Sequence, residues 1–173
     1  MGYTTDFGGQ FTLNRKLDLE TFNLLKGLNT TRRMGRKGLD PKYGMEGEFY
    51  VADEDKGIID SNTPPKTQPG LWCQWAPTED GLHIEWDGGE KFYEYVAWLQ
   101  YLLEKVLVPR GYVLNGTVEW QGEENEDFGE IWVQDNAIST RRGERTYGEP
   151  ELVWEPEVPE TKPTKKKGRK TKQ

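Results

Sequence analysis

The sequence feature that most constrains the fold is a stepped series of apolar residues in the second half of the chain. The members of the series are Phe92, Val96, Leu99, Leu103 and Val106. Steps of four and three residues place side chains on one face of an α-helix. The series stops before Pro109 to Gly111, residue types that end helices. The sequence therefore predicts an amphipathic helix that packs one face against a core.

Runs in which apolar and polar residues alternate lie on both sides of this helix. Residues 71–76 and 82–86 alternate around an Asp-Gly turn signal, and residues 112–121 and 129–134 alternate around an acidic turn. Alternation is typical of a strand with one buried face, and a short turn between two such runs indicates a hairpin. We therefore expect one hairpin before the helix and another after it.

The first part of the chain has weaker patterns. Residues 3–13 predict a strand with a bulge at Gly8-Gly9, and a helix capped by Asp18 is expected to run to about Met34. Residues 46–52 alternate and predict another strand, whereas the proline-rich residues 53–70 predict a long loop. The order is then strand, helix, strand, hairpin, helix, hairpin.

This order predicts an α+β fold, a mainly antiparallel sheet with two amphipathic helices packed on one face. The chain has 173 residues, which suits a single domain. We expect that domain over residues 1–154, followed by a Pro/Glu linker over residues 155–160 and a disordered basic tail over residues 161–173.

Charge is distributed unevenly along the chain. Residues 1–43 carry eight basic and four acidic residues, whereas residues 44–160 carry eight basic and 26 acidic residues. Residues 161–173 carry seven basic residues and no acid. The acidic region could mimic nucleic acid toward a basic host protein. The basic tail could contact nucleic acid weakly or rest on its own acidic domain.

The small number of reactive residues excludes several kinds of site. Cys73 is the only cysteine and His83 the only histidine, so an intramolecular disulfide, a Cys-based zinc cluster and a His-pair metal site are excluded. A nucleophilic pair of these two is disfavoured because Cys73 lies in an alternating run typical of buried strands. Glycine-rich phosphate loops are absent, and we expect no cofactor and no metal. No apolar run approaches the roughly 20 residues of a membrane span, so a cytoplasmic protein is expected.

A candidate ligand site combines cationic and aromatic residues. Arginine guanidinium groups suit phosphate, and an exposed tryptophan could stack on a purine. The alternatives are that the arginines complement a helix C-terminus and that the tryptophans pack in the core. Glycines before the second helix could leave backbone amides accessible to an anion at the helix N-terminus. Alternatively, the Glu90 carboxylate could interact with that N-terminus itself. The candidate ligand-binding residues are Arg32, Arg33, Arg36, Gln68, Trp72, Gln74, Glu85, Lys91 and Tyr93.

Several stretches combine aromatic, glycine and charged residues in a recognisable way. They are MGYTT at residues 1–5, TRRM at 31–34, PGLWCQW at 69–75, EWDGGEKFY at 85–93, GYVLNG at 111–116 and EWQGE at 119–123. Over about residues 1–139 the chain resembles a family of small uncharacterised proteins of bacteriophages and bacteria. The resemblance implies a phage or bacterial setting, and it transfers no activity and no catalytic residue.

Three functions remain open. The first is a non-catalytic, phage-type binding protein that interferes with a host system by holding a small phosphorylated, nucleotide-like ligand. The second is an acidic inhibitor that mimics nucleic acid toward a basic host protein. The third is a hydrolase that uses the carboxylates of Glu85, Asp87 and Glu90. Binding is favoured over catalysis because no catalytic motif stands out, and the oligomeric state is not predicted.

Overall fold

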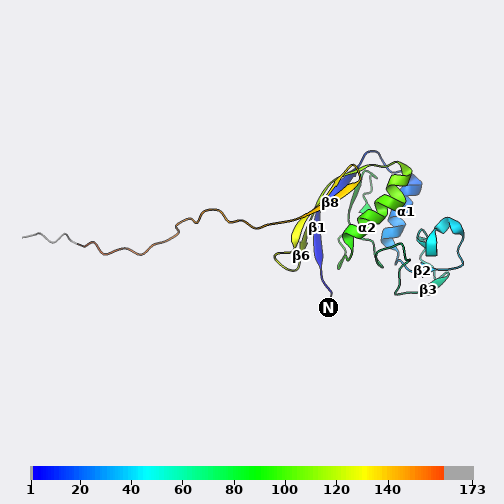
Figure 1. The fold of residues 1–173 in the computed structure, drawn as a ribbon, viewed down its shortest axis with the longest axis horizontal. Helices are drawn as coiled ribbons and strands as arrows, with labels where there is room; N and C mark the ends of the chain where they lie inside the picture. The colour runs from blue at the N-terminus through cyan, green and yellow to red at the C-terminus, as the bar shows by residue number, and fades with distance from the viewer. Residues whose placement is uncertain (1, 162–173) are drawn as a thin grey trace, which may run out of the picture.

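The computed structural model describes residues 2–161 (Figure 1). Its main sheet has six strands in the order β4-β5-β1-β6-β7-β8, and every neighbouring pair is antiparallel. These strands are β1 (Thr5–Leu13), β4 (Trp75–Pro77), β5 (His83–Trp86), β6 (Leu114–Gly122), β7 (Phe128–Gln134) and β8 (Ala137–Arg142). The predicted mainly antiparallel sheet is confirmed.

Two helices cover one face of this sheet (Figure 1). Helix α1 spans Leu19–Thr30, and α2 spans Tyr95–Leu102 before continuing through a π-helical turn, Leu103–Leu107, and a 3-10 turn, Val108–Arg110. As predicted, Asp18 caps α1, because its carboxylate accepts a 2.7 Å hydrogen bond from the Thr21 amide. The α+β class with two helices on one face is therefore confirmed.

The connections follow the split β-α-β pattern. Strands β1 and β4 are joined through α1 and are separated in the sheet by β5. Strands β5 and β6 are joined through α2 and are separated by β1. Strands β7 and β8 then extend the sheet beyond β6 as antiparallel hairpins. Because both crossovers place their helix on the same side, no helix from residues 2–161 covers the opposite face of the sheet (Figure 1).

The core lies between the helices and the covered face of the sheet. Alternate residues of the strands point into it, including Phe11, Ile84, Val118 and Ile131, and each is at most 1% exposed. An aromatic cluster surrounds Phe7, whose ring lies 4.9–5.8 Å, between centroids, from the rings of Trp75, Trp86, Phe92 and Tyr95. Two of the chain's seven tryptophans, Trp75 and Trp86, are thus accounted for by packing rather than by ligand binding.

Several predicted boundaries in the first half are wrong. Helix α1 ends at Thr30 rather than near Met34, because Thr31 is extended and the Arg33 amide donates to the Leu71 carbonyl. The strand predicted over residues 46–52 does not form. Glycines with positive φ at 44 and 47 bend this segment into 3-10 turns, η1 (Pro41–Tyr43) and η2 (Met45–Gly47).

The structure also contains strands that the sequence patterns did not predict. A small second sheet pairs β2 (Gly35–Arg36) with β3 (Ile58–Asp60), the latter inside the predicted loop of residues 53–70. Strand β8 was missed because it has only one partly buried apolar residue, Ile138. The predicted bulge at Gly8-Gly9 is wrong, since the ladder between β1 and β6 runs without a shift along all of β1.

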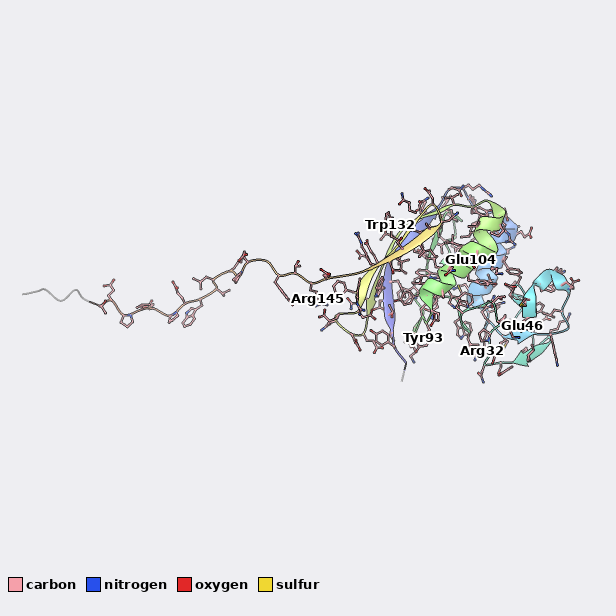
Figure 2. All side chains as sticks on the ribbon, in the orientation of Figure 1. Arg32, Glu46, Tyr93, Glu104, Trp132 and Arg145 are labelled. Atoms are coloured by element: carbon pink, nitrogen blue, oxygen red, sulfur yellow. The ribbon has the colours of Figure 1, made fainter. Side chains whose placement is uncertain are left out.

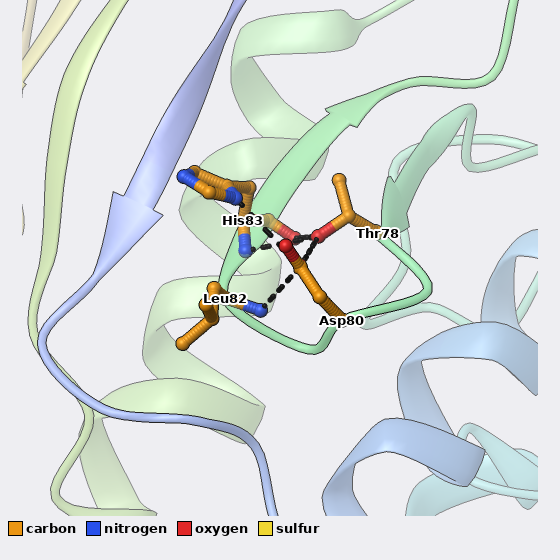
Figure 3. A network of polar contacts seen from close by, with 4 residues as sticks. All are labelled: Thr78, Asp80, Leu82 and His83. Atoms are coloured by element: carbon orange, nitrogen blue, oxygen red, sulfur yellow. Dashed lines mark hydrogen bonds and ion pairs between the residues drawn. The ribbon is translucent and has the colours of Figure 1, made fainter.

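The hairpin between β4 and β5 closes with the Asp-Gly turn that its sequence predicted. Figure 3 shows the contacts: Thr78 Oγ1 donates to Asp80 Oδ1 at 2.5 Å, and the Leu82 amide donates to the same oxygen at 3.0 Å. These hydrogen bonds lower the pKa of the Asp80 carboxyl below its ordinary value. His83 Nδ1 lies 3.7 Å from the same carboxylate. These contacts stabilise the turn between β4 and β5.

After β8 the chain leaves the domain as an extended arm, residues 146–161, without helix or strand (Figure 1). The predicted linker over residues 155–160 lies within this arm. Of the predicted basic tail only residue 161 is described, so the tail itself lies outside the described residues. Within residues 2–161, none of the helices combines the length and apolar character needed to cross a bilayer.

Candidate functional site

Arg33 is central to the sequence-predicted ligand site, and its guanidinium is buried at 2% exposure. It donates to Gln68 Oε1 at 3.2 Å and to Thr31 Oγ1 at 2.6 Å. It also donates to the backbone carbonyls of Glu48 at 2.9 Å and Tyr50 at 3.0 Å. Burial lowers the pKa of Arg33 to about 10. The guanidinium therefore ties three segments of the chain together from inside.

Gln68 belongs to the same buried network. Its amide nitrogen donates to the Glu48 carbonyl at 2.7 Å and to the Tyr101 hydroxyl at 3.0 Å. Tyr101 in turn donates to Glu48 Oε1 at 2.8 Å. Burial raises the pKa of Tyr101 well above its ordinary value. The structure thus brings Arg33 and Gln68 together as predicted, with protein atoms as their partners.

The other two arginines of the predicted cluster are also engaged. Arg36, 5% exposed, donates to the carbonyls of Glu54 and Lys56 at 2.6 and 2.7 Å, and its guanidinium lies 4.6 Å from the centre of the Tyr50 ring. Arg32 is closer to the surface and donates to the Ser61 carbonyl at 2.7 Å. These arginines organise loops, and Arg32 is the member of the cluster nearest to solvent.

The aromatic part of the predicted site is exposed. Trp72 is 46% accessible and follows Leu71, the backbone partner of Arg33. Gln74, by contrast, is buried, donating to the Glu90 carbonyl at 2.7 Å and accepting from Trp86 Nε1 at 3.0 Å. Trp72 therefore lies beside the arginine segment, whereas Gln74 stabilises the segment before α2.

The remaining predicted ligand residues lie elsewhere. Tyr93 accepts a hydrogen bond from the Tyr3 amide at 3.1 Å. Lys91 packs near Gly2, with its side-chain carbons 2.6 Å from a Cβ built on that glycine. Glu85 is exposed on β5. The nine predicted residues thus do not form one site.

The Asp87 carboxylate is already engaged by the segment before α2. The Gly89 amide donates to Asp87 Oδ1 at 2.7 Å, and Asn29 Nδ2 donates to Asp87 Oδ2 at 2.8 Å. Helix α2 begins only at Tyr95, after Glu94 with a φ of 56°. The carboxylate of Asp87 is therefore used to fix this segment, which weakens both the anion-binding and the hydrolase hypotheses here.

Cys73 is buried, and its thiol donates to the Trp75 carbonyl at 3.6 Å. Burial raises the pKa of this thiol to about 12, so it is protonated at neutral pH. A thiol in this state is a poor nucleophile. Among the described residues, no group of three or more histidine, cysteine or acidic residues could hold a metal ion.

The face of the sheet opposite the helices is a candidate that the sequence analysis missed. We call it the open face, and its outward side chains come from alternate positions of the strands. Its residues used below are Asp6, Gly8, Glu119, Phe128, Glu130, Trp132 and Arg141. Figure 2 labels Trp132 on the sheet side of the molecule and Glu104 on the helix side. Trp132 is 48% exposed.

A straight row of residues crosses four strands of the open face. Gly8 pairs with Glu119, Glu119 with Glu130, and Glu130 with Arg141. Arg141 forms an ion pair with Glu130. Glu119 forms no ion pair with any residue between 2 and 161. Two carboxylates directly opposite each other repel, and a single arginine compensates only one of them.

A hollow of about 450 Å³ lies at this row, and we call it the Gly8 hollow. Its lining includes Gly8, the half-buried ring of Phe128, three carboxylates and two arginines; the charged residues are Asp6, Glu119, Glu130, Arg141 and Arg142. A Cβ built on Gly8 has no atom within 4 Å, so the missing side chain leaves open space. The Phe128 ring already faces one cation, since the Arg145 guanidinium lies 5.3 Å from its centre. The hollow combines an uncompensated carboxylate with an aromatic wall.

The turn beside this hollow is held by specific contacts. Asp127 accepts from the Tyr3 hydroxyl at 2.6 Å and from Trp120 Nε1 at 3.0 Å, and both bonds lower the pKa of its carboxyl. Glu123 accepts from the Thr4 amide at 2.6 Å. The acidic turn of residues 123–127 is thus anchored to the chain's N-terminal segment. It forms an acidic rim next to the sheet.

The alternation of β1 and β6 could have identified the open face, because it assigns Asp6, Gly8 and Glu119 to the polar side of each strand. Alternation does not reveal the strand register, and it is the register that places Glu119 beside Gly8 and Glu130.

No protein-family model, curated protein or solved structure matches this chain. The fold and the open face define an α+β sandwich of split β-α-β topology, with a hollow lined by three carboxylates and two arginines. The resemblance to phage proteins stays a prediction.

Proposed function

We propose that the protein is a non-catalytic binding protein that holds a basic segment of another protein on its open face. The observation that carries the proposal is the row of Gly8, Glu119, Glu130 and Arg141, in which Glu119 has no cationic partner among the described residues. A lysine or arginine entering the Gly8 hollow would relieve the repulsion between the two glutamates. This proposal develops the second function from the sequence analysis, an acidic inhibitor of a basic host protein, and assigns the open face as its binding surface.

The chemistry of the hollow suits a long cationic side chain. Its aliphatic stem would pack on the Phe128 ring while its charged end reached Glu119 and Asp6. Exposed Trp132, one row away on β7, offers a second apolar contact. The acidic rim at residues 123–127 would speed association with a positively charged partner through long-range attraction.

The same features disfavour nucleic acid on this face. Split β-α-β sheets that bind RNA stack bases on aromatic residues and need cations for the phosphates. The open face has aromatics, but the carboxylates of Asp6, Glu119 and Glu130 outnumber Arg141 and Arg142 around the hollow, and Arg141 is already paired with Glu130. A phosphorylated small ligand at the arginine cluster is also disfavoured, since Arg33 and Arg36 already donate to protein oxygens.

The resemblance to phage proteins would make the partner a basic bacterial host protein, such as one that itself binds nucleic acid. An acidic face that occupies such a protein's basic surface would interfere with its function. This setting is part of the proposal, and it rests on the resemblance and the charge of residues 44–160.

The proposal is tested by fluorescence anisotropy with a labelled oligoarginine peptide and the full-length protein. We expect binding that weakens as salt rises from about 50 to about 300 mM. Glu119→Gln and Gly8→Leu, which fills the hollow without changing charge, should each weaken binding about tenfold. Glu104→Gln on the helix side is the charge-matched control and should have little effect. Equal weakening by Glu119→Gln and Glu104→Gln, with none by Gly8→Leu, would overturn the proposal.

A further inference from the structure

The arm that follows β8 exposes three consecutive apolar residues. Leu152, Val153 and Trp154 are 75%, 93% and 77% accessible. Isolated apolar residues are common on protein surfaces, but a continuous apolar segment usually marks a contact with another surface. No described residue of the domain covers this segment.

The arm is suited to binding as an extended strand. Pro150, Pro156 and Pro159 restrict the residues before them to extended conformations. In an extended chain Leu152 and Trp154 point to one side and Val153 to the other. A segment that is already extended loses less conformational entropy when it docks against a strand edge.

The domain itself offers a matching surface at β8, the last strand of the sheet. The outer edge of β8 has no neighbouring strand within residues 2–161, so its backbone groups can pair with an added strand. Beside it lies a second hollow, of about 480 Å³, lined by Leu103, Val108 and Ile138 among others. Val108 is 49% exposed there. The edge and the hollow together could receive a strand with apolar side chains.

Charge and spacing agree for antiparallel addition. The C-terminal end of β8 carries Arg141, and Ile138 lies three residues before it. The arm carries Glu149 at its start, and Leu152 lies three residues later. An antiparallel arm would therefore place Glu149 opposite Arg141 and Leu152 opposite Ile138, with Leu152 and Trp154 on the side of the hollow.

Local contacts direct the arm away from its own β8 edge. The Gly143 amide donates to the Phe128 carbonyl at 2.8 Å, and Arg145 donates to the Asn125 carbonyl at 2.7 Å. These bonds continue the chain along β7 toward the acidic turn, and Figure 1 shows the arm leading straight out from the sheet. These hydrogen bonds keep the arm from the β8 edge of its own copy, but they do not keep it from the β8 edge of a second copy.

We propose that two copies of this chain exchange arms, each arm adding to the β8 edge of the other copy with Leu152 and Trp154 over the hollow beside Val108. The resulting contact is reciprocal, as a two-fold dimer requires. The proposal goes beyond the proposed function, because it uses the sheet edge and the hollow on the helix side rather than Gly8 and Glu119. The two sites share only Arg141.

The test is sedimentation velocity on the full-length protein from about 1 to about 100 µM. Wild type should form a dimer, and Trp154→Ala should raise the dissociation constant at least about tenfold. Trp72→Ala, which removes a similarly exposed tryptophan on the domain, is the control and should leave the dimer intact. A wild-type monomer at every concentration would overturn the proposal, as would a dimer that Trp154→Ala leaves unchanged.

Hydrogen exchange on the same samples separates an arm exchanged between copies from an arm folded back on its own domain. In the dimer, amides of residues 150–155 and the outward-facing amides of residues 137–142, which do not pair with β7, should be protected. This protection should fall on dilution and in Trp154→Ala. Protection of residues 150–155 in a species that sediments as a monomer would contradict the exchange.

Discussion

Gly8 lies directly opposite Glu119 in the ladder between β1 and β6, and a Cβ built on Gly8 has no atom within 4 Å. The neighbouring glycine differs, because Gly9 has a φ of 100° and its Cβ would lie 2.8 Å from the Thr117 carbonyl oxygen. Two adjacent glycines therefore have opposite roles. Gly9 is required by the backbone, whereas Gly8 leaves the hollow open at a cost in strand stability.

This contrast predicts opposite effects of two alanine substitutions. Gly8→Ala should raise the free energy of unfolding by about 0.5–1 kcal/mol, because glycine in a strand interior loses more entropy on folding. Gly9→Ala should lower it by about 1–3 kcal/mol through backbone strain. Urea unfolding followed by circular dichroism measures both. Similar losses in the two variants would show that Gly8 is also confined by its surroundings.

Replacing Arg33 should destabilise the protein. Arg33→Met leaves the carbonyls of Glu48 and Tyr50 without their donor inside the domain, and should cost about 3 kcal/mol in urea unfolding. Arg32→Met removes hydrogen bonds at the surface and should cost less than about 1 kcal/mol. A folded Arg33→Met protein of unchanged stability would mean that this guanidinium is free to serve a ligand.

Cys73 should be unreactive in the folded protein. Its pKa of about 12 and its burial keep it as a protected thiol, so a disulfide reagent at pH 8 should modify it only as fast as the domain opens. Adding urea to above the unfolding midpoint should give one modified thiol per chain. Rapid modification without denaturant would contradict the burial of Cys73 and would support its thiol as a nucleophile.

Asp127 should contribute to stability above acidic pH. Its pKa is lowered in the folded state by the hydrogen bonds from Tyr3 and Trp120, while in the unfolded chain it titrates near about 3.9. Acid therefore protonates the unfolded state first, and the contribution is present above the unfolded pKa and lost as pH falls through the folded pKa. Asp127→Asn should thus destabilise most near neutral pH, with a difference that shrinks below about pH 4.

Urea midpoints measured across pH for wild type and Asp127→Asn give this difference directly. Asp55→Asn, at an exposed carboxylate, is the matched control and should change the urea midpoint little. A difference for Asp127→Asn that stayed constant down to low pH would show that the Tyr3 and Trp120 bonds do not favour the ionised carboxylate.

Strong local periodicity allowed the α+β class to be predicted. The steps from Phe92 to Val106 and the Asp-Gly turn at residue 80 each depend on neighbours within a few residues. The strand predicted over residues 46–52 failed because glycines 44 and 47 adopt positive φ, which alternation does not reveal. Strand β8 was missed because backbone pairing with β7 holds it in the sheet, and it lacks the alternating apolar face that would reveal a strand in the sequence.

The candidate site was harder to predict for a physical reason. Arginines at residues 33 and 36 have the chemistry of a phosphate site, but whether they bind ligand depends on carbonyls from residues 48–56 that only the fold brings near. The open face likewise depends on register. Glu119 and Glu130 lie on opposite sides of the acidic turn of residues 123–127, and only the ladder places them opposite each other.

The most direct test of the open-face proposal is a map of amide chemical shifts on titration of the isotope-labelled, full-length protein with oligoarginine. The largest changes should fall at residues 6–8, 119–121 and 128–130, and they should be lost in Gly8→Leu. Changes centred instead on the acidic residues 149–160 of the arm, and retained in Gly8→Leu, would contradict a binding site in the Gly8 hollow.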